Sequence, residues 1–161
     1  MAATIEEKIE RMLVEGKKRS EIVLELKGKE DPQKLLFYIN NISRPADRKK
    51  YQILNLALAL ALTFVTTKKL ITAFSFGVLD FFLLVSLVAP VINIYLLREI
   101  LRFRKIGYQF LFVLSLLSVL HPENHFALEA TLLFTIIALS GFLYFTMFPK
   151  KERISEISSG S

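Results

Sequence analysis

The chain contains an apolar run from Leu70 to Leu97 that is long enough to cross a lipid bilayer. This run has about 28 residues and holds one charge, Asp80, and one proline, Pro90. A transmembrane helix needs about 20 apolar residues, so the run spans the hydrocarbon core and extends into an interface. The sequence therefore predicts an all-α, polytopic membrane protein.

Basic or polar residues separate four apolar stretches, which predicts a four-helix transmembrane bundle over residues 51–148. The expected spans cover residues 51–67, 70–97, 106–120 and 126–148. Lys68 and Lys69 would form the first turn, and Gly107 would break the chain before the third span. That span has only about 15 residues, near the lower limit for crossing, but flanking basic side chains can reach the interface.

The distribution of lysine and arginine predicts how the spans are oriented. Eleven basic residues lie near span ends on the side that holds both termini, and two, Lys68 and Lys69, lie on the other side. Loops rich in lysine and arginine stay in the cytoplasm. We therefore expect a multi-pass protein of the plasma (inner) membrane, with residues 1–50 and the tail 149–161 both cytoplasmic. The residues expected to contact anionic lipid headgroups are Arg48, Lys49, Lys50, Arg98, Arg102, Arg104 and Lys105.

Residues 1–50 form a polar segment for which the sequence predicts three short helices. Thr4 and Glu7 have the spacing of a capping box, and Asp31 followed by Pro32 is typical of a helix start. So short a segment makes a poor core by itself, and we expect its apolar faces to dock onto the membrane, the bundle or another subunit. Its twelve basic residues against nine acidic ones leave a weak excess, so we do not expect nucleic acid as a partner.

The composition narrows the chemistry that the chain can perform. There is no cysteine, which excludes thiolate metal sites, thiol redox chemistry and covalent haem attachment. Both histidines lie in one predicted loop, which excludes a bis-histidine haem inside the bundle. The sequence contains no phosphate-binding loop, paired intramembrane acids or catalytic triad. These features argue against an enzyme, and we expect no cofactor.

Asp80 is the main candidate for a functional residue within the membrane, because an acid there costs about 2.5–3.5 kcal/mol on insertion scales. It would either carry ions or protons, together with Glu129, or hydrogen-bond to a polar residue of a neighbouring span. Pro90 removes the helical donor to the carbonyl of Ser86 and predicts a helix kink. We expect a structural role for Asp80 and a packing role for the kink.

One polar cluster has the residue types of a metal site. His121, Glu123, His125 and Glu129 lie at the start of the fourth span, and the last two share a helical face. The alternative is an ordinary helix start, because the proline and asparagine between these residues are typical of such positions. We expect the helix start.

Small and polar residues predict which faces of the spans meet, because helices in lipid associate through such residues. The first span carries one such face and the last span another. These residues are Gln52, Asn55, Ala59 and Thr66 in the first span, and Ala127, Thr131, Thr135, Ala138 and Gly141 in the last.

The hypothesis that fits these features best is a non-enzymatic structural or accessory subunit. It would self-associate as a homo-oligomer or belong to a larger membrane complex, with the anionic cytoplasmic leaflet as its lipid partner. Two alternatives stay open. One is a small ion or proton channel or transporter that uses Asp80, and the other is a membrane enzyme or metal site at the histidine and glutamate cluster.

Overall fold

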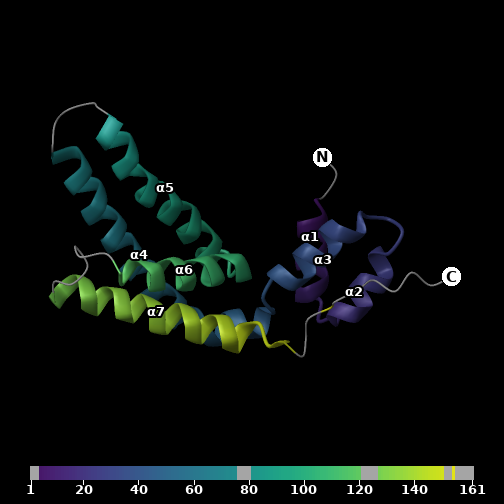
Figure 1. The fold of residues 1–161 in the computed structure, drawn as a ribbon. Helices are drawn as coiled ribbons and strands as arrows, with labels where there is room; N and C mark the ends of the chain where they lie inside the picture. Colours follow the sequence, from purple (N-terminus) through teal and green to yellow (C-terminus); the bar gives the residue numbers. More distant parts are fainter. Residues whose placement is uncertain (1–3, 76–80, 121–126, 151–153, 155–161) are drawn as a thin grey trace.

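The computed structural model describes residues 4–75, 81–120, 127–150 and 154 of the 161-residue chain. Over these ranges the chain is all-helical, and one isolated β-bridge joins Ile42 to Arg104. Figure 1 shows a group of short helices near the N-terminus and a second group of longer helices. We call residues 4–42 the N-terminal unit and residues 45–150 the bundle.

The N-terminal unit consists of three short helices, as the sequence predicts. They are α1 (Ile5–Val14), α2 (Arg19–Leu26) and α3 (Pro32–Asn41). The Thr4 hydroxyl accepts a hydrogen bond from the backbone N–H of Glu7, and the Glu7 carboxylate accepts one from the N–H of Thr4, which completes the predicted capping box. At the start of α3, the Asp31 carboxylate accepts from the backbone N–H groups of Gln33 and Lys34.

The same hydrogen bonds lower the pKa of the Asp31 carboxyl, because they favour its charged form; the bond from Lys34 is the main cause.

Two glycines make the turns between the helices, with φ of 86° at Gly16 and 77° at Gly28, a conformation that costs glycine little. The helices enclose a small apolar core. Its buried residues are Ile9, Leu13, Ile22, Val23, Leu26, Leu35, Ile39 and Ile42.

The bundle contains four longer helices, three of which are long and apolar enough to cross a membrane. The helices are α4 (Pro45–Ser75), α5 (Phe81–Leu101), α6 (Lys105–Ser118) and α7 (Ala127–Met147). The candidate membrane spans are α4, residues Leu83–Leu101 of α5, and α7. At 1.5 Å per residue, the 14 residues of α6 extend about 21 Å, less than the roughly 30 Å of a hydrocarbon core. These findings indicate a helical membrane protein.

The predicted turn at Lys68 and Lys69 is wrong, because α4 continues through both residues to Ser75. Lysine is a good helix former, and this stretch has no glycine or proline to end the helix. The Lys68 ammonium instead forms an ion pair with Glu129 of α7. Residues 70–75, expected to begin the second span, therefore belong to the first long helix.

The segment between the expected second and third spans, residues 98–105, is mostly helical. Helix α5 continues to Leu101, and α6 begins at Lys105, so three residues make the turn. Phe103 in this turn has a φ of 54°, which is uncommon for a residue other than glycine. The predicted break at Gly107 is also wrong, because Gly107 lies inside α6 and is buried.

The four long helices run antiparallel in sequence order, and each packs against two neighbours (Figure 1). Helices α4 and α6 both contact α5 and α7. The start of α4, the end of α5, the start of α6 and the end of α7 all lie at the end nearest the N-terminal unit. The buried core of the bundle consists of Leu58, Leu62, Leu96, Ile100, Tyr108, Leu111, Ile136, Leu143, Met147 and Phe148.

The two predicted packing faces have different outcomes. In α4, Asn55, Ala59 and Thr66 are buried, while Gln52 is exposed. In α7 only Gly141 of the predicted face is buried, and the rest of that face is exposed, so no helix of the described chain covers it. The residues that α7 buries instead are Ile136, Ser140, Leu143 and Met147, together with Gly141.

Candidate functional site at the junction of the N-terminal unit and the bundle

A buried arginine joins the N-terminal unit to the bundle. The side chain of Arg104, in the turn between α5 and α6, is only 2% exposed and forms an ion pair with Glu6 of α1. Glu10 lies one helical turn further along α1, and its carboxylate is 3.9 Å from the Arg104 guanidinium. Arg102 also pairs with Glu6, and Arg48 of α4 pairs with Glu10 at 3.1 Å. We call these five residues the Arg104 cluster.

Backbone contacts hold Arg104 in this position. Its N–H donates to the carbonyl of Glu99 at 2.9 Å, which closes the turn that contains Phe103. Its backbone also forms the β-bridge with Ile42, at the end of the N-terminal unit. Burial lowers the pKa of the Arg104 guanidinium, but arginine stays protonated in proteins. The turn therefore presents a fixed positive charge to the acidic face of α1.

Two consecutive asparagines of α3 form a second contact between the parts. The Asn41 amide oxygen accepts from the backbone N–H of Ile106 at 2.9 Å, which caps the start of α6. The Asn40 amide donates to the Ile154 carbonyl at 2.9 Å and accepts from the Ile154 N–H at 3.1 Å. Ile154 also packs against the core of the N-terminal unit. The chain beyond α7 is thus bound to α3.

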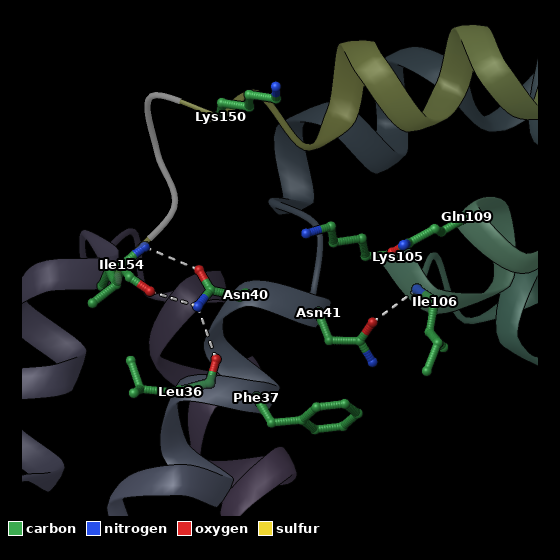
Figure 2. A pocket seen from close by; sticks show the side chains of 9 residues that line it. All are labelled: Leu36, Phe37, Asn40, Asn41, Lys105, Ile106, Gln109, Lys150 and Ile154. Atoms are coloured by element: carbon green, nitrogen blue, oxygen red, sulfur yellow. Dashed lines mark hydrogen bonds between the residues drawn. The ribbon is translucent and has the colours of Figure 1, made fainter. Parts of the chain in front are cut away.

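A cavity of about 570 Å³ lies between these two contacts (Figure 2). Three segments line it: α3, the start of α6 and the chain after α7. The lining side chains comprise two ammonium groups, three amides and four apolar groups, and none of the nine lining residues is acidic. The lining residues are Leu36, Phe37, Asn40, Asn41, Lys105, Ile106, Gln109, Lys150 and Ile154.

A buried hydrogen-bond network ties α4 to the turn between α5 and α6. The Asn55 amide nitrogen donates to the carbonyl of Ile100 at 3.1 Å, and the Tyr108 hydroxyl donates to the Asn55 amide oxygen at 2.6 Å. Asn55 and Tyr108 are both buried, so the network pairs polar groups that would otherwise be costly in the bundle core. It therefore fixes the turn that carries Arg104.

Most of the predicted intramembrane and metal-site residues lie outside the described part of the chain. This applies to Asp80, His121, Glu123 and His125, whose predicted roles remain predictions. Glu129 is described, and its carboxylate pairs with Lys68 at the end of the bundle opposite the Arg104 cluster. Among the described residues, no group of three or more histidine, cysteine, aspartate or glutamate side chains could hold a metal ion.

The other predicted site residues take different positions. Pro90 is buried within α5, which is a single helix across it. Three of the predicted lipid-contacting residues, Arg48, Arg102 and Arg104, pair with acidic residues of α1. The other four lie on the surface or in the cavity: Lys49, Lys50 and Arg98 are exposed, and Lys105 lines the cavity.

The acidic partners and the asparagines of the junction were missed by sequence reasoning. Glu6 and Glu10 are four residues apart and share a helical face. This spacing is the sequence feature that could have identified an acidic surface on α1. That spacing does not identify which arginine faces them, because Arg104 is almost 100 residues away in the chain. No sequence feature marked Asn40, Asn41 or Lys150 as part of a site, apart from their positions at the ends of predicted helices.

Comparison with known proteins found no matching family model, no similar curated protein and no similar solved structure. The fold itself defines the class: an all-helical chain with three candidate membrane spans, to which a small N-terminal helical unit is bound.

Proposed function

We propose that this protein is a non-enzymatic structural or accessory subunit of the plasma (inner) membrane, which self-associates or joins a larger membrane complex. The observation that carries the proposal is an exposed face of small and hydroxyl residues on α7. Within the described part of the chain, Ala127, Thr131, Thr135 and Ala138 are exposed rather than packed against another helix. Helices in lipid associate through such faces, so a second copy or another subunit would cover this one.

Four membrane crossings, with both termini cytoplasmic, form part of the proposal. Asn40 binds Ile154, so the chain returns after α7 to the unit from which it entered the bundle. A chain that returns to its starting side crosses an even number of times. Three helices are candidate spans, and α6 with its flanking residues would supply the fourth crossing. From Glu129 to Met147, α7 extends about 27 Å, close to the thickness of a hydrocarbon core.

The N-terminal unit, which is bound to the bundle, would offer its exposed apolar residues to a partner subunit. The Arg104 cluster attaches α1 to the bundle, while Val14 and Leu24 remain 72% exposed. In the transport alternative, Asp80 would carry the ion or proton, and Glu129 is an additional candidate. The carboxylate of Glu129 is paired with Lys68, which argues against Glu129 in that role.

The first test is the mass of the protein particle in mild detergent. A single chain has a mass of 18.5 kDa. We expect light scattering, corrected for bound detergent, to give at least twice this mass, or a stoichiometric complex with other membrane subunits. Thr131→Leu with Thr135→Leu should reduce the association, because bulky side chains prevent close approach. A monomer that conducts cations or protons in liposomes would contradict the proposal and favour the transport alternative.

The second test addresses topology. Because the chain has no cysteine, single introduced cysteines report their own positions. We expect cysteines at Lys29 and Arg98 to react with impermeant maleimide from the cytoplasmic side only, and a cysteine at Asn124 from the opposite side only. Labelling of Asn124→Cys from the cytoplasmic side would rule out four crossings.

A further inference from the structure

A second, smaller cavity adjoins the Arg104 cluster, and we call it the Glu99 cavity. Its volume of about 170 Å³ is below the range that is usual for whole small-molecule ligands, so it suits one polar group of a larger molecule. It lies among α1, α3, the end of α5 and the start of α6. The lining residues are Glu6, Phe37, Tyr38, Asn41, Tyr95, Glu99, Arg102, Arg104 and Ile106.

Glu99 lines this cavity without a partner of its own. The residue is only 9% exposed, and within the described part of the chain its carboxylate forms no hydrogen bond or ion pair. Glu6, the other acid of the lining, pairs with both Arg102 and Arg104. A buried carboxylate without a partner is costly, and buried polar groups in proteins are almost always hydrogen-bonded. Glu99 therefore marks the place where a hydrogen-bond donor with a positive charge would bind.

The charges around the cavity are separated in a way that suits a zwitterion. The Arg104 cluster contains three arginines and two glutamates, which leaves one positive charge in excess. Arg102 lies one helical turn after Glu99, and its guanidinium has N–H groups besides the one that it donates to Glu6. A ligand with an ammonium group at Glu99 and an anionic group at Arg102 satisfies both charges, whereas a simple cation or anion satisfies only one.

Aromatic rings place the ammonium end of such a ligand at Glu99. Phe37, Tyr38 and Tyr95 line the cavity with it, and Phe37 and Tyr95 are about half exposed. Ring faces attract ammonium groups through their negative electrostatic potential. The Glu99 carboxylate adds an acceptor for a charge-assisted hydrogen bond, which only an ammonium group that carries N–H can donate. The site therefore favours a primary amine over a fully methylated one.

The surface beside Tyr95 indicates that the ligand is a lipid. Val91 and Val88 lie four and seven residues before Tyr95 on the same face of α5, and they are 63% and 54% exposed. This face belongs to the candidate membrane span Leu83–Leu101. Acyl chains would lie along these valines while the headgroup enters the cavity at the end of the span. Free ethanolamine phosphate would gain nothing from this apolar surface.

We propose that the Glu99 cavity binds the headgroup of a phosphatidylethanolamine lipid, with the ammonium group at Glu99 and the phosphate at Arg102. The bound headgroup connects α1, α3 and α5, and it thereby stabilises the attachment of the N-terminal unit. This inference goes beyond the subunit role, and it rests on the position of the junction at a membrane surface, which is part of the proposed function.

The test uses the full-length protein in an uncharged maltoside detergent, titrated with short-chain phosphatidylethanolamine. We expect saturable binding and a rise in the unfolding temperature, because a ligand that binds only the folded state stabilises it. Glu99→Gln keeps the shape of the side chain but removes its charge, so it should weaken binding about tenfold or more. The matched control, Glu15→Gln, removes an exposed acid outside the cavity and should change the affinity less than about twofold.

Two measurements guard against misfolding of the variants. Glu99 makes no ion pair within the described residues, so Glu99→Gln without lipid should unfold at no lower temperature than wild type. Tyr95→Leu keeps an apolar side chain at a half-exposed position but removes the ring, and it should weaken binding at least about twofold.

Three further ligands test the chemistry of the headgroup. Short-chain phosphatidylcholine lacks the N–H groups, phosphatidylglycerol lacks the ammonium group, and free ethanolamine phosphate lacks the acyl chains. Each should bind about tenfold more weakly or less. Equal binding of any of the three, unchanged binding by Glu99→Gln, or no saturable binding would overturn the inference. The mass and labelling experiments do not depend on lipid binding, so they report separately on the proposed function.

Discussion

Replacing Glu6 with glutamine is expected to release the N-terminal unit from the bundle. The change leaves the buried guanidinium of Arg104 with Glu10, at 3.9 Å, as its remaining ion-pair partner. An uncompensated buried charge costs about 3–5 kcal/mol, and the residual attraction of Glu10 favours the lower end. About 3 kcal/mol corresponds to a more than hundredfold rise in opening of the junction. Hydrogen exchange of α1 amides in detergent should accelerate accordingly.

The double variant Glu6→Gln with Arg104→Met provides the decisive comparison. Methionine fills the space of the arginine stem without a charge, so most of the lost stability should return. Glu25→Gln is the matched control, because Glu25 pairs with Lys17 on the exposed surface of the same unit and should have little effect. If Glu6→Gln exchanged as slowly as wild type, the Arg104 cluster would not be the attachment point.

The fold was predictable from the sequence wherever local signals act alone. The cap at Thr4 and the start at Asp31 with Pro32 depend on neighbouring residues, and both helices begin where the sequence predicts. The continuation of α4 through Lys68 and Lys69 was not predictable from hydropathy, because two charges inside an apolar stretch resemble a loop. Their aliphatic stems can lie along the helix while the ammonium of Lys68 reaches Glu129, a contact made by tertiary structure.

The packing face of α7 shows a second limit. A pattern of small residues identifies a surface suited to helix association, but it does not say whether the partner is in the same chain. Gly141 packs against the ring of Phe112, while Thr131 and Thr135 on the predicted face stay exposed. The junction was less predictable still, because Glu6 and Arg104 come together only when two distant segments fold against each other.

Gly107→Ala is expected to destabilise the bundle by about 1–2 kcal/mol. A Cβ at Gly107 would lie 2.9 Å from the Cβ of Glu99 and 3.0 Å from the backbone nitrogen of Ile100. Both atoms belong to the last turn of α5, so the clash is relieved only by moving α5 away from α6. Such overpacking costs about 1–3 kcal/mol, and the upper part of that range applies because backbone must move. Alanine regains about 1 kcal/mol of helix propensity over glycine, which offsets part of this cost. Reversible unfolding in mixed micelles with increasing dodecyl sulfate measures the change.

Gly141→Ala is the matched control, because its Cβ would also lie 2.9 Å from a neighbouring atom, but that atom is on the Phe112 ring. A ring edge can rotate away, and alanine gains about 1 kcal/mol of helix propensity over glycine. We therefore expect a net change below about 1 kcal/mol. Gly107→Ala gains the same propensity yet displaces the turn that carries Arg104, so it should also accelerate hydrogen exchange in α1. Equal stability of the two variants would show that α5 and α6 tolerate a wider separation, and that the junction does not depend on their close approach.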